Sequence, residues 1–455
     1  MSRVGVVMTL CLMWMTPLRA ASVLMISVDG LKPEYVLEAD AHGLKVPYLR
    51  SLMREGAYAE GVIGVWPTVT YPSHTTLLTG VWPSEHGIWN NQEFDPRHIS
   101  GDSWYWYAAQ IQATTLWQAA HADGLSTASV GWPVSVDAPG VDTLIPEYWR
   151  INRPTEDLHA SDAKLIAALS RPVGLLASLE SRLGPYIRGN DPSPAGDTVK
   201  THFALEILKT KRPQFMTIHL SALDEEQHTH GPFSSEANAE LEILDSYMSE
   251  LFAAARANDP ASIAVVVSDH GFVPLSHRVN LWTPFIQAGL VTIGTDARTH
   301  GWSVTSWKAQ PWIAGGMAAI MLQQPGDAST LHTVRGLLQG FARDERNGVA
   351  AVLEGDEARR RGGFPGAAFV VVMKSGYYTA ADPTADAVAE VHGTPGGHGF
   401  SPEYPEMRAA FFMAGSGIAQ HRNLGVIDMR QIAPTVANVL NVTLPGAKST
   451  ALRVR

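Results

Sequence analysis

Short apolar runs rich in branched aliphatic residues alternate with amphipathic segments along most of the chain. The apolar runs predict buried strands at Val23–Val28, Ser126–Gly131, Gln214–Leu220, Ile263–Ser268, Ala368–Met373 and Arg408–Ala414. Segments with helical periodicity lie at Pro47–Glu55, Thr115–Asp123 and Glu236–Ala257. This alternation is typical of an α/β fold with a mostly parallel central sheet flanked by helices.

The sequence between these elements shows no internal repeat and no linker that divides the chain. We therefore expect one domain over residues 21–455. Asn190–Gly196 predicts a loop because it is rich in Pro, Gly, Asn and Asp. The segment from Val279 to Gly397 has helix and strand signals of its own, which predicts a smaller inserted subdomain or a lid.

The stretch from Pro67 to Gly80 predicts a short helix whose start presents the hydroxyl of Thr70. Pro72 suits the first helical position, and Gly80 suits the residue just past the end. The free N–H groups and peptide dipoles of the first turn would favour a phosphate or another oxyanion beside Thr70. The alternative is a capped surface helix with several hydroxyls, since Ser and Thr are preferred caps.

The composition and net charge of the chain restrict which molecules it is expected to bind. The chain has 455 residues, of which 45% are hydrophobic and 17% charged, which fits a soluble globular protein with a sizeable core. The net charge is −10 and no long basic run occurs, so a nucleic-acid polymer is not an expected partner. An anionic substrate would have to be neutralised locally, by metal ions or by a few placed donors.

The N-terminal segment matches a secretory signal peptide over residues 1–20. Arg3 precedes an apolar run from Val4 to Met15, and small residues follow at Ala20 and Ala21. The run is too short to span a bilayer, so we expect no membrane span in the mature chain and a periplasmic or secreted location. The alternative is a buried first strand or helix. The lone cysteine, Cys11, lies inside this segment, so neither disulfides nor thiol ligands are expected in the mature chain.

Acidic residues follow the predicted strands where open α/β sheets place their sites. Asp29 ends the first strand, Asp224 follows the third, and Asp269 with His270 ends the fourth. Asp224 and His228 are spaced to share one face if their turn is helical; the alternative is a solvated acidic turn. Asp and His together favour zinc over magnesium or calcium, and two clusters suggest two ions. Metal coordination could also activate a threonine hydroxyl as nucleophile.

At these residues the chain resembles the nucleotide pyrophosphatase/phosphodiesterase branch of the alkaline phosphatase superfamily. The matching motifs are Val28-Asp29-Gly30, Pro67 to His74, Thr79 to Ile88, Trp132-Pro133, Asp224 to Pro232, Ser268-Asp269-His270-Gly271 and Gly397-His398-Gly399-Phe400. Each motif alone is weak, but the ordered set is specific. The resemblance implies an alkaline-phosphatase-like fold. It also implies an enzyme that acts on a small-molecule phosphodiester or nucleotide.

The resemblance also implies roles for particular residues. One Zn²⁺ would be held by Asp224, His228 and His398. The other would be held by Asp29, Asp269, His270 and the Thr70 oxygen. Thr70 would attack phosphorus and water would hydrolyse the phospho-threonine, with Asn91 and the N–H after Thr70 holding a phosphoryl oxygen. Tyr71 and Tyr148 stand where relatives place aromatic residues against the substrate base.

Several points remain open in the sequence. His392 competes with His398 for the last ligand position, and we favour His398 because of the motif around it. No Lys or Arg occurs between Arg54 and Arg97, which favours diesters over the more highly charged monoesters. A cation could still come from elsewhere, for example from Arg150, Arg153 or Lys200. A phosphomonoesterase, a phosphonate hydrolase and a non-catalytic exported binding domain are the alternative functions.

Overall fold

The computed structural model describes residues 21–98, 104–149, 158–295, 301–382 and 385–455. The expected signal peptide at residues 1–20 lies outside this part of the chain. Among the described residues, no helix combines the length and the apolar character that crossing a membrane requires.

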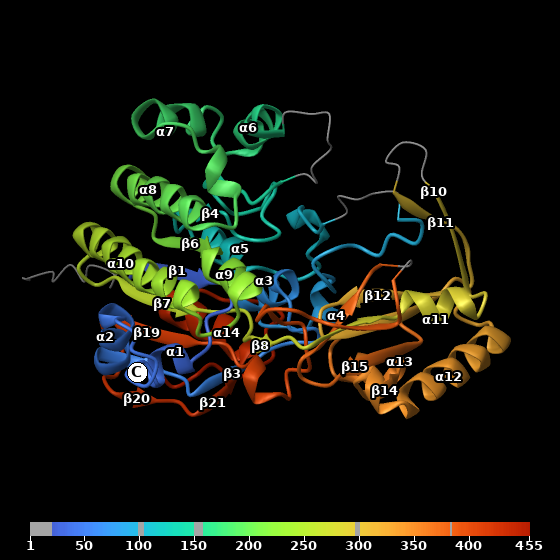
Figure 1. Cartoon of the computed structure of the whole chain (residues 1–455). Coiled ribbons are helices and arrows are strands. Elements are labelled where there is room, and N and C mark those ends of the chain that lie inside the picture. The colour runs from blue at the N-terminus through green and yellow to red at the C-terminus, as the bar shows by residue number, and fades with distance from the viewer. Residues whose placement is uncertain (1–20, 99–103, 150–157, 296–300, 383–384) are drawn as a thin grey trace, which may run out of the picture.

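An eight-stranded sheet forms the centre of the larger part of the molecule (Figure 1). In spatial order its strands are β20 (Arg422–Asn423), β2 (Gly56–Tyr58), β19 (Phe411–Gly415), β7 (Ile263–Val267), β1 (Val23–Val28), β6 (Phe215–Leu220), β4 (Thr127–Val130) and β5 (Thr143–Ile145). β19 runs antiparallel to both of its neighbours, and the other pairs are parallel. The predicted α/β fold with a mostly parallel sheet is confirmed.

The strands at the middle of this sheet are buried on both faces, as their continuous apolar sequences require. Alternate side chains of β1 point to opposite faces, so Leu24 and Ile26 join one hydrophobic cluster while Val23 and Met25 join another. The first cluster is covered by helices that include α2 (Pro47–Glu55), α7 (Leu175–Leu183), α8 (Pro194–Lys211) and α10 (Ser235–Asn258). The second is covered by α3 (Thr70–Thr79), α5 (Leu116–Ala122) and α14 (Ile432–Leu440).

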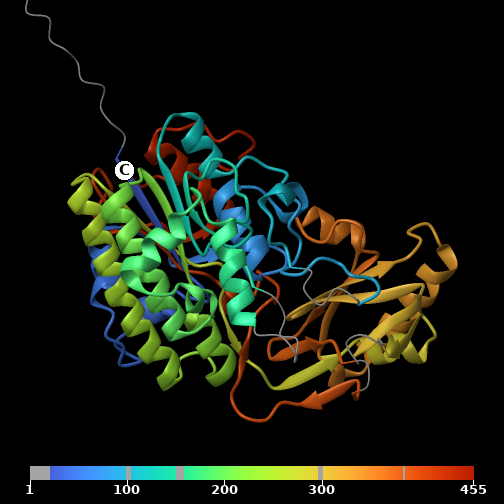
Figure 2. The same cartoon turned by 90° about the horizontal axis from the view of Figure 1, so that it is seen from above.

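A smaller part lies beside the main sheet and comes from the segment expected to be an inserted subdomain (Figure 2). Its largest sheet is antiparallel, in the order β12 (Ala309–Ala314), β13 (Met317–Leu322), β15 (Phe369–Met373) and β14 (Val349–Glu354). Around it lie α11 (Trp282–Gln287), α12 (Ala328–Arg343), α13 (Gly355–Arg360), a ribbon of β10 (Val291–Thr295) with β11 (Trp302–Trp307), and a sheet of β16 (Tyr377–Ala380), β9 (His277–Asn280) and β17 (Val388–Glu390). The strand predicted at Ala368–Met373 therefore belongs to this second sheet.

The remaining α-helices and strands lie between these parts of the chain. They are α1 (Glu34–Leu37), α4 (Pro83–His86), α6 (Leu158–Leu169), α9 (Ala222–His230), β3 (Gly61–Ile63) paired with β21 (Val426–Asp428), and β8 (Val273–Pro274) paired with β18 (Gly396–Gly397).

The predicted loop at Asn190–Gly196 is wrong at its second half, because α8 already begins at Pro194. The side chain of Ser193 accepts a hydrogen bond from the Gly196 N–H and caps the helix. Pro194 stands at the first helical position, where its missing N–H has no cost. Pro194, which contributed to the loop prediction, is here a signal of a helix start.

Candidate active site

The candidate site lies at the carboxyl end of the central strands. β1 is in register with β6 and β7, with Val28 opposite Leu220 and Ser27 opposite Val267, so the three strands end together. Asp29 follows β1 directly and Asp269 follows β7 within two residues. The register therefore brings acidic residues that are far apart in sequence to one edge of the sheet.

α3 enters this edge with Thr70 as its first residue. Residues 71–79 are all buried, while Thr70 is partly exposed, so the helix presents this hydroxyl to a cavity. The alternative of a surface helix is excluded. The helix begins two residues before the predicted Pro72, which still lies in the first turn, where its N–H is not needed. Gly80 ends the helix in the left-handed region with φ 71°, as predicted.

One group of potential metal ligands consists of Asp29, Asp269 and His270, whose ligand atoms all lie within 4.8 Å of one another. All three residues are buried. His270 Nε2 lies 3.1 Å from Asp269 Oδ2 and 3.4 Å from Asp29 Oδ1. These are the protein residues expected at one of the two metal positions.

The second group of ligand atoms comes from Asp224, His270 and His398. Asp224 and His228 lie one turn apart on α9, as their spacing predicted, with His228 Nε2 3.4 Å from Asp224 Oδ2. His398 Nε2 lies 3.8 Å from Asp224 Oδ1. The rings of His270 and His398 stack with centroids 3.7 Å apart, so His270 stands between the two groups.

The structure places His398, and not His392, beside Asp224. His398 is 7% exposed and lines the cavity, whereas His392 is exposed beyond β17. His398 Nδ1 lies 3.1 Å from the Thr68 carbonyl, and His228 Nδ1 lies 3.1 Å from the Gly396 carbonyl. Donation to these carbonyls places the proton on Nδ1 and leaves Nε2 as a metal ligand, which is the usual arrangement of metal-binding histidines.

Burying these acidic residues in their charged form costs free energy unless a cation lies beside them. Burial, followed by the charge of Asp224, raises the pKa of Asp29 well above its usual value. Burial, followed by the charge of Asp29, does the same to the pKa of Asp269. Burial and the neighbouring histidine His228 lower the pKa of His398 to about 3. Bound metal ions would offset this repulsion and use neutral imidazoles.

Unpaired buried atoms also fit metal ions. Asp29 Oδ1, Asp224 Oδ1 and Asp269 Oδ2 are buried without a hydrogen-bond partner among the described residues, as is His270 Nε2. Buried polar atoms of a folded protein are normally satisfied. All four atoms belong to the two groups above, so the residues present fit a pair of metal ions.

A cavity of ≈250 Å³ opens next to these residues. Thr70 and Asn91 line it, together with Asp29, Asp224, His228 and His398. Asn91 Oδ1 accepts a hydrogen bond of 2.9 Å from the Tyr71 N–H. The N–H after Thr70 is therefore used to orient Asn91, which leaves the Asn91 NH₂ group to donate elsewhere.

Of the two tyrosines expected beside the substrate base, Tyr71 lines the cavity and Tyr148 does not. Tyr71 lines the cavity but is 1% exposed, and its hydroxyl donates a 2.5 Å hydrogen bond to Glu147 Oε1. Glu147 and Trp149 line the cavity and Tyr148 does not. The Tyr148 ring packs against Trp106 instead. The predicted contact of Tyr148 with a substrate base stays a prediction.

Sequence reasoning missed two further residues of the wall, Glu147 and His219. The signal for His219 is an imidazole at the second-to-last position of a mostly apolar strand. Of the cations left open by the sequence, Lys200 lines the cavity, whereas Arg150 and Arg153 lie outside the described residues. Lys200 Nζ lies 2.7 Å from Asp197 Oδ1 and donates to Ser221 Oγ over 2.8 Å.

Comparison with known proteins assigns the chain to a family. The sequence profile of the Type I phosphodiesterase / nucleotide pyrophosphatase family matches residues 23–400. The chain belongs to this family. The match begins at β1 and ends just after His398, so it includes every residue of the two ligand groups.

Curated members of this phosphodiesterase family show the same relationship at low identity. Ectonucleotide pyrophosphatase/phosphodiesterase family member 1 of Rattus norvegicus is 25% identical over 258 residues, which cover 54% of this chain and 24% of that protein. A venom phosphodiesterase of Naja atra is 22% identical over 273 residues, 58% of this chain and 28% of that protein. The matched segment thus spans about a quarter of the length of these relatives.

Solved structures of the family share the fold over nearly the whole chain. Human ectonucleotide pyrophosphatase/phosphodiesterase 5 superimposes with a TM-score of 0.64 at 16% identity, covering 94% of this chain and 97% of that one. The murine protein, in a threonine-to-alanine form described as inactive and in complex with AMP, gives a TM-score of 0.63 at 17% identity, covering 95% and 97%.

Proposed function

We propose that this protein is an exported hydrolase that binds two zinc ions and cleaves phosphodiester or pyrophosphate bonds, in particular those of nucleotides. The observation that carries the proposal is the position of Thr70 at the start of a buried helix, on the wall of the cavity that Asp29, Asp224 and His398 also line. Export is inferred from the signal-peptide pattern of residues 1–20.

The donor set supports zinc. It combines carboxylates with imidazoles, and all-oxygen sites are the preference of magnesium and calcium. Asp29, Asp269 and His270 would hold one ion together with the Thr70 oxygen, and Asp224, His228 and His398 would hold the other. When bound, the two ions would supply positive charge to the phosphoryl oxygens and to the attacking and leaving oxygens.

The residues of the chain then carry the reaction in two displacements. Thr70 Oγ1 gives up its proton to solvent and forms a bond to phosphorus as the bond to the first leaving group breaks, and that group departs with a proton from solvent. Water then attacks phosphorus, the bond between phosphorus and Thr70 Oγ1 breaks, Oγ1 takes up a proton, and the phosphomonoester product is released. The Asn91 NH₂ group would donate to the phosphoryl oxygen on which charge develops.

The related murine structure supports both the nucleophile and the substrate class. That protein is described as inactive when a threonine is replaced by alanine, and it binds AMP. In the present chain Trp104 and Trp149 line the cavity, and aromatic rings are sequence-tolerant platforms for a nucleobase. A nucleotide ester or pyrophosphate fits these features.

One observation favours a phosphomonoesterase as the second candidate function. Lys200 is 3% exposed and lines the cavity, and an extra cation would suit the dianion of a monoester. Against this, Lys200 is paired with the buried Asp197, which already neutralises its charge. We therefore retain the preference for diesters.

The substrate preference is tested by kcat/KM on bis-(p-nitrophenyl) phosphate, p-nitrophenyl phosphate and thymidine monophosphate p-nitrophenyl ester, with one preparation of the enzyme. We expect the nucleotide ester to be fastest and the monoester slowest, because the aromatic wall binds the base and Lys200, the cation that lines the cavity among the described residues, is already paired with Asp197. A clear preference for the monoester would overturn the assignment to diesters and favour the second candidate. Lys200→Met should then reduce monoester turnover more than diester turnover.

A further inference from the structure

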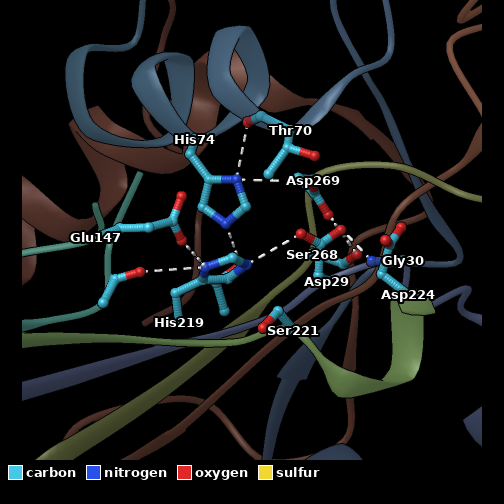
Figure 3. A network of polar contacts seen from close by, with 12 residues as sticks. Asp29, Gly30, Thr70, His74, Glu147, His219, Ser221, Asp224, Ser268 and Asp269 are labelled. Carbon is cyan, nitrogen blue, oxygen red and sulfur yellow. Dashed lines mark hydrogen bonds and ion pairs between the residues drawn. The ribbon is translucent and has the colours of Figure 1, made fainter. Parts of the chain in front are cut away.

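His219 lies in the wall of the cavity, between residues that come from four parts of the chain (Figure 3). It is the fifth residue of β6 and is 2% exposed. Its Nε2 lies 3.0 Å from Asp29 Oδ2. Its Nδ1 lies 3.1 Å from Glu147 Oε2 and 3.2 Å from the carbonyl of Gly131. The ring is thus held at both ends by oxygen acceptors.

The contact with His219 gives the two carboxylate oxygens of Asp29 different surroundings. Oδ2 is held by the imidazole, whereas Oδ1 has no hydrogen-bond partner among the described residues and lies 3.4 Å from His270 Nε2. Rotation of the carboxylate away from the metal group would break the contact with His219. His219 therefore fixes the direction in which Oδ1 points, as the partners of metal ligands commonly do.

The other end of the network reaches the helix that carries Thr70. Glu147 Oε1 accepts the hydrogen bond of Tyr71, which directly follows Thr70 in the chain. The His219 ring also packs edge to face against His74 of the same helix, with centroids 4.5 Å apart. His74 Nδ1 in turn lies 2.8 Å from the Thr70 carbonyl.

A continuous path of polar contacts thus runs from Asp29 through His219 to Glu147 (Figure 3). It continues to Tyr71 through the hydrogen bond between the Tyr71 hydroxyl and Glu147. We propose that His219 and Glu147 are positioning residues that hold the metal ligand Asp29 and the start of the Thr70 helix in one fixed arrangement. Both would act through the residues that they contact, Asp29 and Tyr71. The inference rests on the proposed function for its effect on turnover, but its effect on metal binding can be measured without substrate.

Two substitutions of His219 test its contact with Asp29 apart from the contacts of its Nδ1 atom. A Gln amide reaches the position of Nε2, whereas an Asn amide reaches only that of Nδ1. His219→Gln should keep the contact with Asp29 and bind Zn²⁺ nearly as tightly as the unmodified protein. His219→Asn should lose that contact and bind Zn²⁺ about 10- to 100-fold more weakly. The measurement is chelator competition on metal-stripped protein, with circular dichroism and Tm of the metal-free form as folding checks.

His86→Asn is the matched control, because His86 is also fully buried but contacts Thr76 and the Ile88 N–H instead of a metal ligand. This variant should lose stability and keep its zinc affinity. Equal zinc affinity in His219→Asn, His219→Gln and the unmodified protein would overturn the positioning role alone. Failure of the unmodified protein to bind zinc would overturn the proposed function and this inference with it.

The Glu147 end is tested by turnover. Tyr71→Phe removes the hydroxyl and keeps the ring on the cavity wall, so kcat should fall about tenfold with little change in KM, the scale of one hydrogen bond to a charged group. Glu147→Ala removes the same bond from its other side. If both act through this bond, adding Tyr71→Phe to Glu147→Ala should cause no further loss of kcat. The proposal would be contradicted if the two losses of kcat multiplied in the double variant, or if only KM changed.

Discussion

At the scale of single residues, the assignment of the last metal ligand is directly testable. His398 is buried beside Asp224 with its Nδ1 held by a carbonyl, whereas His392 is exposed. His398→Ala should therefore lose one of two bound zinc ions and most of the activity. His392→Ala, the matched control, should keep both ions. Metal analysis of the purified variants decides the question, and the reverse pattern would show that the ligand is His392.

The metal ligands could be proposed from the sequence because each lies in a short motif next to a strand end. Their partners could not. His219 and Glu147 come from separate segments, and only the pairing of β6 with β1 places His219 beside Asp29. The position of Trp149 on the cavity wall could not be predicted either, because the direction of a side chain in a loop depends on contacts that are distant in sequence.

At the scale of elements, the end of α3 depends on Gly80. Its φ is 71°, and an added Cβ would lie 3.1 Å from Pro434 Cδ and 3.2 Å from the Arg430 carbonyl oxygen. Gly80→Ala should destabilise the protein by about 1–3 kcal/mol, through backbone strain and these contacts. Urea unfolding measures the loss.

Gly124→Ala is the matched control for this prediction. Gly124 has φ +80°, but nothing lies within 4 Å of its added Cβ. It should show the backbone strain alone, about 1 kcal/mol. A loss for Gly80→Ala no greater than that for Gly124→Ala would refute the role given to the close packing at the end of α3.

Local sequence patterns predicted the bounds of helices and strands better than they predicted which strands pair. β1 and α2 have the predicted bounds, because a continuous apolar run and an amphipathic segment starting with Pro are strong local signals. The strand at β15 was also predicted, but its antiparallel partners are β13 and β14 in a second sheet. Strand pairing is set by long-range contacts that a local pattern does not contain.

At the scale of the whole molecule, the fold gathers buried acids that repel one another. Removing the metal ions should therefore lower Tm, because Asp29 and Asp269 then face each other without a compensating charge. Added zinc at about 100 times its Kd should restore about 2.7 kcal/mol per site. Magnesium should not, since the sites contain imidazoles. Unchanged Tm and activity after chelation would contradict a metal-bearing site.

The order of strands and helices in the sequence predicted the α/β class. It also predicted which edge of the sheet carries the site. It did not predict the arrangement of the Val279–Gly397 segment beside the main sheet, because the short strands of this segment carry no signal of where their sheets pack. Whether this segment closes over the cavity stays a hypothesis.

The central claim is that Thr70 is the nucleophile of a metal-assisted hydrolase. The most direct test is to measure zinc content and kcat/KM on bis-(p-nitrophenyl) phosphate for Thr70→Ala in one experiment. The account predicts both zinc ions retained on the remaining ligands and activity lower by about 10³-fold or more, because only the attacking oxygen is lost. Near-normal turnover with both ions bound would contradict it and indicate direct attack by water.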